Sequence, residues 1–101
     1  MRLNVYSIFD TATGAYMRPF FLQSDGQAMR LFCDIAMDAE HEVGKHPEDY
    51  HLARLGVWND QDAQYSPEKV STLITGLQAV AASRQVPPGQ VDIEDGGMKG
   101  A

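Results

Sequence analysis

The sequence predicts an α+β fold, a two-layer sandwich in which an antiparallel sheet of three to four strands carries two helices on one face. Two observations predict this class. Some stretches alternate polar and apolar residues, as half-buried strands do, and others repeat apolar residues at helical spacing. Their order along the chain is β-β-α-β-(β)-α. An antiparallel sheet with both helices on one face buries all of these apolar stripes together.

Strands are predicted at residues 2–9, 15–23 and 52–59, and residues 63–65 are expected to return as a short fourth strand. The predicted strands contain aromatic and β-branched residues, which fit a pleated, half-buried surface. Residues 10–14 have turn chemistry and end in a glycine, so they are expected to join the first two strands into a hairpin.

Two helices are predicted from their capping signals. The first begins at the capping box Ser24-Asp25-Gly26-Gln27. The second begins at Ser66-Pro67-Glu68, which combines a capping hydroxyl, a proline at the first helical position and an acid favoured by the helix dipole. It is expected to end at Val86-Pro87-Pro88-Gly89. Its apolar stripe consists of Val70, Leu73, Ile74, Leu77, Val80 and Ala81.

The length and composition favour one folded domain. A chain of 101 residues, 44% of them hydrophobic, can bury one core without disulfides. We expect this domain at residues 1–86, followed by a flexible, acidic, glycine-rich tail at residues 87–101. No run approaches the roughly 18 apolar residues of a membrane span. Cys33 is the single cysteine, so a cytosolic, reducing environment is expected.

Residue types that often carry chemistry show no recognised arrangement. The histidines His41, His46 and His51 stand five residues apart, which does not place them on one helical face or match a known zinc or calcium spacing. A polar loop is therefore favoured there over a metal site. Cys33 lies within a predicted helix without an activating motif, and no glycine-rich phosphate loop is present. The sequence predicts no enzyme activity, no cofactor and no metal.

The most informative constellation lies on the predicted sheet. If one apolar set of strand residues faces the helices, arginines and aromatic residues share the opposite face. The set expected to face the helices comprises Leu3, Val5, Phe9, Met17, Phe21, Ala53, Leu55 and Val57. The arginine and aromatic set comprises Arg2, Tyr6, Tyr16, Arg18, Phe20, Arg54 and Trp58. Rings on an open sheet stack unpaired bases while guanidinium groups hold phosphates, which suits single-stranded nucleic acid. The same residue types are enriched in protein interfaces, so a homodimer face is the alternative, and the net charge of -6 favours it.

Two other features are candidates for contact with partner proteins. The loop between the first helix and the third strand contains Lys45, His46, Glu48, Asp49 and Tyr50. The first helix also carries a second apolar stripe of Met29, Cys33 and Met37. This stripe indicates either burial of the helix on more than one side or a soft contact surface for another protein.

Several segments resemble one protein family. They are Leu3-Asn4-Val5-Tyr6-Ser7-Ile8-Phe9-Asp10, Pro19-Phe20-Phe21, Ala28-x-Arg30-x-Phe32-x-Asp34, Gly44-Lys45-His46-Pro47-Glu48-Asp49-Tyr50 and Leu55-Gly56. Over residues 3 to about 60, the chain is similar to the small nonstructural protein of gokushoviruses. These are tailless bacteriophages of the Microviridae with circular single-stranded DNA genomes. The run from Gly44 to Tyr50 is the most specific part of the resemblance.

The resemblance implies a late, non-enzymatic factor in the host cytoplasm, associated with the replication and packaging of viral DNA. The implied partners are single-stranded viral DNA, the replication initiator and the procapsid. The resemblance raises the expectation of single-strand binding through the arginine and aromatic face. The alternative is a homodimeric adaptor that contacts the replication or capsid proteins without binding DNA.

Overall fold

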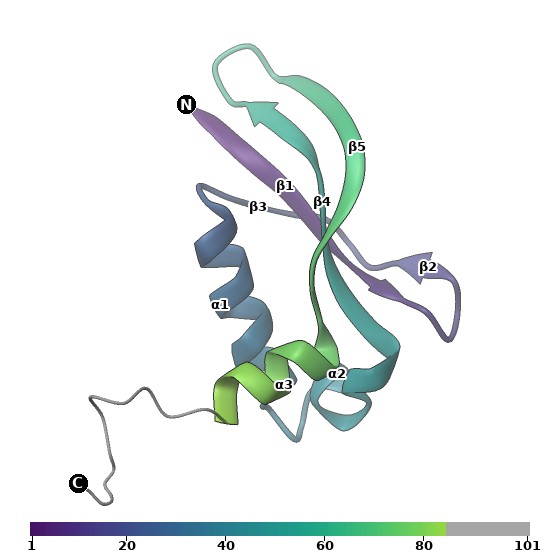
Figure 1. Cartoon of the computed structure of the whole chain (residues 1–101). Helices are drawn as coiled ribbons and strands as arrows, with labels where there is room; N and C mark the ends of the chain where they lie inside the picture. The colour runs from purple at the N-terminus through teal and green to yellow at the C-terminus, as the bar shows by residue number, and fades with distance from the viewer. Residues whose placement is uncertain (85–101) are drawn as a thin grey trace, which may run out of the picture.

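The computed structural model describes residues 1–84 (Figure 1). In chain order the elements are β1 (Arg2–Asp10), β2 (Ala15–Tyr16), β3 (Phe20–Leu22), α1 (Asp25–Ala36), α2 (Glu42–Lys45), the 3-10 helix η1 (Pro47–Asp49), β4 (Tyr50–Asn59), β5 (Gln64–Thr75) and α3 (Gly76–Arg84). An antiparallel sheet of five strands, with helices packed against it, confirms the predicted α+β class. The predicted tail and the last two residues of the predicted domain lie outside the described residues.

The sheet is built around β1 and β4, in the strand order β2-β1-β4-β5. The predicted hairpin turn joins β1 to β2, and Gly14 adopts a φ of 71°, a left-handed conformation that suits glycine. The returning strand is interrupted around Pro19, which has no amide hydrogen to donate. As a result, β2 pairs with the end of β1 at Phe9, and β3 pairs with the middle of β1 at Val5.

Helix α1 begins at the predicted cap, where the Ser24 hydroxyl accepts a hydrogen bond from the Gln27 amide at 3.2 Å. Two of the three residues of its second apolar stripe are partly buried. Met29 and Cys33 pack against the core, while Met37 is 46% exposed. Because α3 lies against α1, the helix has neighbours on two sides. Burial on more than one side therefore explains Met29 and Cys33.

One cluster of buried residues joins the helices to the sheet. It contains Tyr6 and Ile8 of β1, Tyr50 and Leu52 of β4, Ile74 of β5, Ala28, Phe32 and Ala36 of α1, Val43 of α2 and Ala79 of α3. Figure 1 shows α1 and α3 on the same side of the sheet. Within residues 1–84, the opposite face of the sheet therefore has no helical cover.

The predicted start of the second helix is wrong. Residues 66–75 belong to β5, and α3 begins only at Gly76. The segment is rich in β-branched residues, and its Ile74 pairs with Leu52 of β4 in the core. Pro67 is tolerated because β5 is an edge strand, where a missing amide donor costs no ladder bond. Gly76 allows close packing, since a Cβ atom there would overlap the Pro47 carbonyl group of η1.

The predicted facing of β1 is also wrong. Tyr6 and Ile8 face the helices, and the alternate residues, among them Val5, face the other way. A β-bulge in β4 adds to the difference, because Val5 pairs with Gly56 while Tyr6 pairs with Arg54, leaving one extra residue between them. Because of this extra residue, the alternation of side chains along β4 is out of step before and after the bulge. Arg54 thus points toward the helices and Trp58 points away from them.

Candidate functional site

The register of β1 and the bulge of β4 divide the predicted arginine and aromatic face between the two sides of the sheet. Tyr6, Phe20 and Arg54 lie on the helix side. Tyr6 is fully buried (0% exposed) and stacks on Phe20 with ring centroids 5.8 Å apart. The expectation that these three residues lie on an open face is therefore wrong.

The remaining four residues of the predicted set are accessible. Trp58 pairs with Leu3, and Tyr16 pairs with Phe9, so both rings lie on the face away from the helices. Arg2 and Arg18 are exposed. The structure thus leaves two rings of the predicted set on the open face.

Arg54 belongs to a polar network at the start of α1. Its Nη1 atom donates to Oδ1 of Asp25 at 3.0 Å, and its Nε atom donates to Oε1 of Glu68 at 3.0 Å. The Tyr6 hydroxyl donates to the same Asp25 oxygen at 2.7 Å and accepts from Nδ2 of Asn4 at 2.9 Å. The network therefore ties α1 to β1, β4 and β5.

The network also fixes the charges of its members. Burial, and then the hydrogen bond to Asp25, raises the pKa of Tyr6 from 10.0 to about 12, so the phenol stays neutral. The hydrogen bond to Glu68 raises the pKa of Arg54 against the opposing effect of burial. Arg54 is therefore a permanent cation that already faces two carboxylates, Asp25 and Glu68. It holds the fold together instead of standing free for a phosphate.

An apolar groove of about 290 Å³ occupies the sheet face away from the helices. It is lined by Val5, Pro19, Phe21, Leu55, Trp58 and Tyr65. The Phe21 and Trp58 rings meet edge to face, with centroids 5.9 Å apart. Phe21 and Tyr65 are 46% and 45% exposed. The groove is thus an aromatic surface within the sheet, and none of the residues that line it is charged.

Gly56 shapes this groove. A Cβ atom there would overlap the Ser66 carbonyl oxygen of β5 and would lie 2.9 Å from the Tyr65 ring. Only a residue without a side chain lets the Tyr65 ring lie so close to β4, where its hydroxyl donates to the Leu55 carbonyl at 3.1 Å. The register of β4 against β5 also shifts here, between Arg54 and Gly56.

Sequence reasoning missed Phe21, Leu55 and Tyr65 as members of this surface. Phe21 and Leu55 had been placed on the helix side, because β1 offers apolar residues on both of its faces. The available signal was the Leu55-Gly56 pair. A glycine within an apolar strand marks a bulge, and a bulge exchanges the faces of the residues beyond it.

The predicted partner loop folds as α2 followed by η1. Lys45 is exposed, and its Nζ atom lies 3.8 Å from Oε2 of Glu42 in α2. Tyr50 is only 8% exposed and belongs to the core. Burial, and then the nearby Asp10, Glu42 and Asp49, raises the pKa of Tyr50. The expectation that Tyr50 belongs to a partner loop is therefore wrong, because Tyr50 begins β4 and lies in the core.

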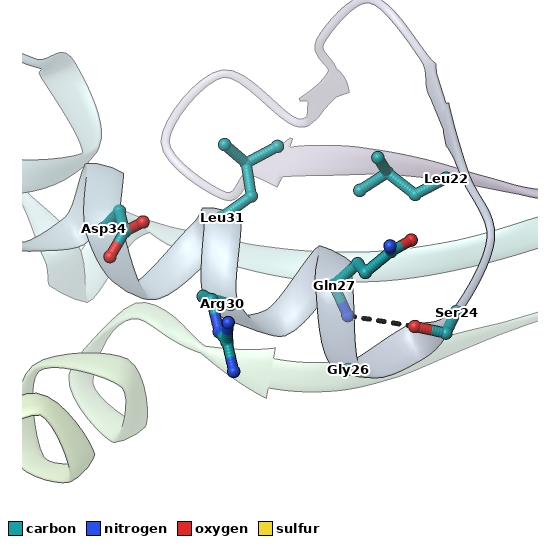
Figure 2. Close-up of a pocket in the computed structure, with 7 residues that line it drawn as sticks. All are labelled: Leu22, Ser24, Gly26, Gln27, Arg30, Leu31 and Asp34. Carbon is teal, nitrogen blue, oxygen red and sulfur yellow. Dashed lines mark hydrogen bonds between the residues drawn. The ribbon is translucent and has the colours of Figure 1, made fainter.

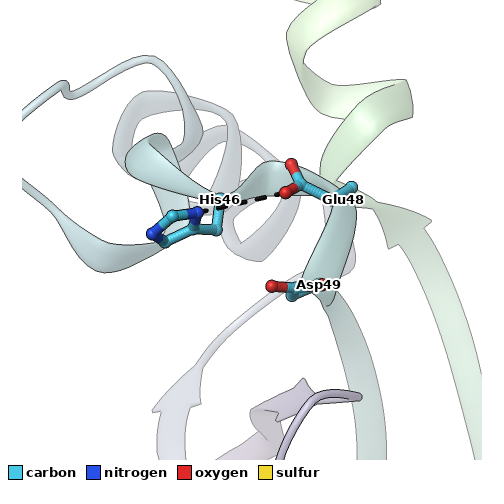
Figure 3. Close-up of side chains that lie close together, drawn as sticks. All are labelled: His46, Glu48 and Asp49. Carbon is cyan, nitrogen blue, oxygen red and sulfur yellow. Dashed lines mark ion pairs between the residues drawn. The ribbon is translucent and has the colours of Figure 1, made fainter.

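The other three members of the loop converge. Possible metal-ligating atoms of His46, Glu48 and Asp49 all lie within 4.8 Å of one another (Figure 3). The Nδ1 atom of His46 is 4.0 Å from Oε2 of Glu48. The spacing of the three histidines did not indicate this cluster, because only one of them takes part in it.

A second hollow of about 550 Å³ lies beside the first turns of α1 (Figure 2). It is lined by Leu22, Ser24, Gly26, Gln27, Arg30, Leu31 and Asp34. The Ser24 hydroxyl in its wall already caps the helix by accepting from the Gln27 amide. Its lining mixes polar and apolar residues, so it has less defined chemistry than the groove on the sheet.

The chain is a small α+β domain with an aromatic groove on one sheet face. The chain matches the family described as Phage ORF5 protein over residues 3–81, and it belongs to that family. The family is therefore one of phage proteins. No curated protein and no solved structure matches the chain. Within residues 1–84, no helix is long and apolar enough to cross a membrane.

Proposed function

We propose that the protein is a non-enzymatic nonstructural protein of a single-stranded DNA phage of the gokushovirus type. In this proposal it takes part in viral DNA replication and packaging in the host cytoplasm by binding other proteins. The observation that carries the proposal is the apolar groove formed by Phe21, Trp58 and Tyr65 with their neighbours. Membership of the phage family supports the phage origin. The resemblance to the gokushovirus protein supports the role in replication and packaging.

The chemistry of the groove favours a protein partner over DNA. No cation lines it, and Arg54, the arginine predicted to hold phosphates, is paired with Asp25 and Glu68. The chain carries a net charge of -6, which opposes the approach of a polyanion. Apolar side chains of a partner would instead gain about 25 cal/mol for each Å² of apolar surface that the groove removes from water.

The first partner to test is a second copy of the chain. Phe21 lines the groove and is 46% exposed. In a twofold dimer, Phe21 of each copy would enter the groove of the other, so that one contact is made twice. Aromatic residues without charged neighbours are also the residues enriched in the cores of dimer interfaces. The replication initiator and the capsid proteins are the further partners of this proposal.

Light scattering across a range of concentrations tests the proposal, with intrinsic fluorescence as a local probe. Trp58 is the single tryptophan, so its emission reports on the groove alone. We expect a dimer mass and a shift of the emission to shorter wavelength as the protein associates. Phe21→Ala should return the mass to that of a monomer. Met37→Ala is the matched control, since Met37 is equally exposed but lies on α1.

A monomer at every concentration would refute the dimer and direct the search to the viral replication and capsid proteins. Loss of the dimer in Met37→Ala but not in Phe21→Ala would place the interface on the helices and refute the use of the groove.

Single-stranded DNA binding is the second candidate, because the Phe21, Trp58 and Tyr65 rings share one open face. Stacking of a base on such a ring contributes about 1 to 3 kcal/mol. Fluorescence anisotropy of a labelled single-stranded oligonucleotide, titrated at low and moderate salt with a duplex control, separates the two candidates. Saturable binding of the single strand that weakens with salt favours the DNA function. No binding at micromolar protein, together with a dimer mass, favours the adaptor.

A further inference from the structure

The η1 turn brings three metal-ligating side chains together for a local geometric reason. Asp49 donates its backbone amide to the His46 carbonyl at 3.0 Å, which closes a 3-10 turn. His46 is the N-cap of η1 and Asp49 is its last residue, and Figure 3 shows their two side chains on the same side of the turn. Glu48 lies next to Asp49, and its carboxylate reaches the imidazole (Figure 3). One imidazole and two carboxylates therefore share one small volume.

The backbone of the turn is held from two sides. The amide and the hydroxyl of Thr11 both donate to the Asp49 carbonyl, at 2.8 and 2.9 Å. On the other side, Gly76 packs so closely that a Cβ atom would overlap the Pro47 carbonyl group. The Cα positions of His46, Glu48 and Asp49 are thus fixed by the β1–β2 turn and by α3. Only the side chains need to move to receive a ligand.

The charges of the cluster are unbalanced. Among the described residues, Glu48 lies within ion-pair distance only of His46, and Asp49 forms no ion pair. The contact between Glu48 and His46 is an ion pair only when the imidazole is protonated. The nearest lysine in sequence, Lys45, lies against Glu42. A divalent cation bound by the imidazole and both carboxylates would neutralise the negative charges of the two carboxylates.

We propose that His46, Glu48 and Asp49 form a binding site for a divalent transition metal ion of the zinc type, with water completing the coordination. Zinc accepts imidazole nitrogen and carboxylate oxygen at about 2.0 to 2.2 Å, which places tetrahedral ligands about 3.4 Å apart. The observed limit of 4.8 Å requires the ligand atoms to approach one another by up to about 1.4 Å. The exposed side chains of His46 and Glu48 can do so by rotamer changes alone. The imidazole selects this class of metal over magnesium and calcium, which prefer oxygen ligands. The site is independent of the groove and of the proposed function.

Isothermal titration of the untagged full chain with Zn²⁺ tests this site. We expect saturable binding of one ion, with Mg²⁺ unable to displace it at equal concentration. His46→Asn and Glu48→Gln should each weaken the binding by about tenfold or more. Glu42→Gln is the matched control, because it removes a neighbouring carboxylate that is not part of the cluster. It should leave the affinity almost unchanged.

The resonances of the His46 ring provide a second readout that does not depend on the heat of binding. They should shift on addition of Zn²⁺ in the wild type. They should also shift in Glu42→Gln, because this control is expected to keep the site. Three results would overturn the proposal: no saturable binding of Zn²⁺, wild-type affinity in His46→Asn, or equal losses in Glu42→Gln and Glu48→Gln. The last result would reduce the effect to general attraction by acidic side chains.

Discussion

Replacing Tyr6 by Phe tests the corrected register of β1, because it removes one hydroxyl and keeps the ring. That hydroxyl donates to Asp25 at 2.7 Å and accepts from Asn4 at 2.9 Å. A hydrogen bond to a charged group contributes about 1.5 to 3 kcal/mol to stability. Asp25 keeps its bond to Arg54 in the variant, so it is not left unpaired. We therefore expect the free energy of unfolding to fall by about 1.5 to 2.5 kcal/mol.

Urea unfolding followed by circular dichroism and by the emission of Trp58 measures this loss. The midpoint should fall without a change in the slope m, because the surface exposed on unfolding stays the same. Tyr16→Phe is the matched control. Its ring is 48% exposed and lies against Phe9, and a surface change of this kind alters stability by less than about 0.5 kcal/mol. Equal, small losses in Tyr6→Phe and Tyr16→Phe would refute the buried position of Tyr6.

A change of pH and three further substitutions test the structure by the same unfolding measurement. The raised pKa of Tyr6, about 12 in place of 10.0, adds stability that is complete below pH 10 and is lost between pH 10 and 12. The stability difference between wild type and Tyr6→Phe should therefore shrink by about 1.4 kcal/mol at pH 11, and a constant difference would contradict the shift. Gly76→Ala should destabilise the protein by about 1 to 3 kcal/mol, since its Cβ would overlap Pro47. A Cβ atom at Gly26 on α1 would meet only the Ser24 hydroxyl oxygen, at an ordinary contact distance of 3.9 Å, so Gly26→Ala should instead stabilise the protein by about 0.5 to 1 kcal/mol. The same sign for both substitutions would exclude the close contact at Gly76. Ser24→Ala removes the cap of α1 and should cost about 0.5 to 2 kcal/mol, whereas no loss would mean that the cap is replaced by water.

The parts of the fold that were predictable from the sequence are those with strong local signals. The capping box at Ser24 and Gln27 defines the start of α1, because its hydrogen bonds form within four residues. Gly14 likewise marks the turn after β1. These features depend on neighbours in sequence, so a linear pattern is enough to find them.

The error at the second helix came from a local signal that the tertiary structure overrides. Ser66-Pro67-Glu68 has the residues of a helix start, but Ser66 pairs with Val57 and Pro67 pairs with Gly56 in the sheet. Glu68 then bonds to Arg54, which a helix starting at the same point would not place next to it. The β-branched residues after Pro67 favour a strand. However, Val70, Leu73 and Leu77 also recur at the spacing of an amphipathic helix, so the pattern alone does not decide between the two.

The candidate site was harder to predict than the fold, since it depends on the register of the strands. In β1 both faces are apolar, with Val5 on one and Ile8 on the other, so alternation alone does not select the buried face. The bulge then moves Trp58 to the face opposite to that of Arg54. A shift of one residue exchanges every side chain between the two faces. Tyr16 and Trp58 were thus placed correctly on an open surface, whereas Tyr6 and Arg54 were not.

The pairing of Arg54 also limits what a DNA-binding function can look like. If single-stranded DNA binds this protein, Arg2 and Arg18 are the arginines of the predicted set that form no ion pair within residues 1–84. The logarithm of the affinity for a single strand falls with the logarithm of salt concentration by about 0.7 for each phosphate contact. Two contacts made by these arginines alone therefore predict a slope of about -1.4. A steeper slope that becomes shallower in Arg54→Met would require Arg54 to leave Asp25 and Glu68. Since these carboxylates anchor α1 and β5, DNA binding would then have to loosen the contact between the helix and the sheet.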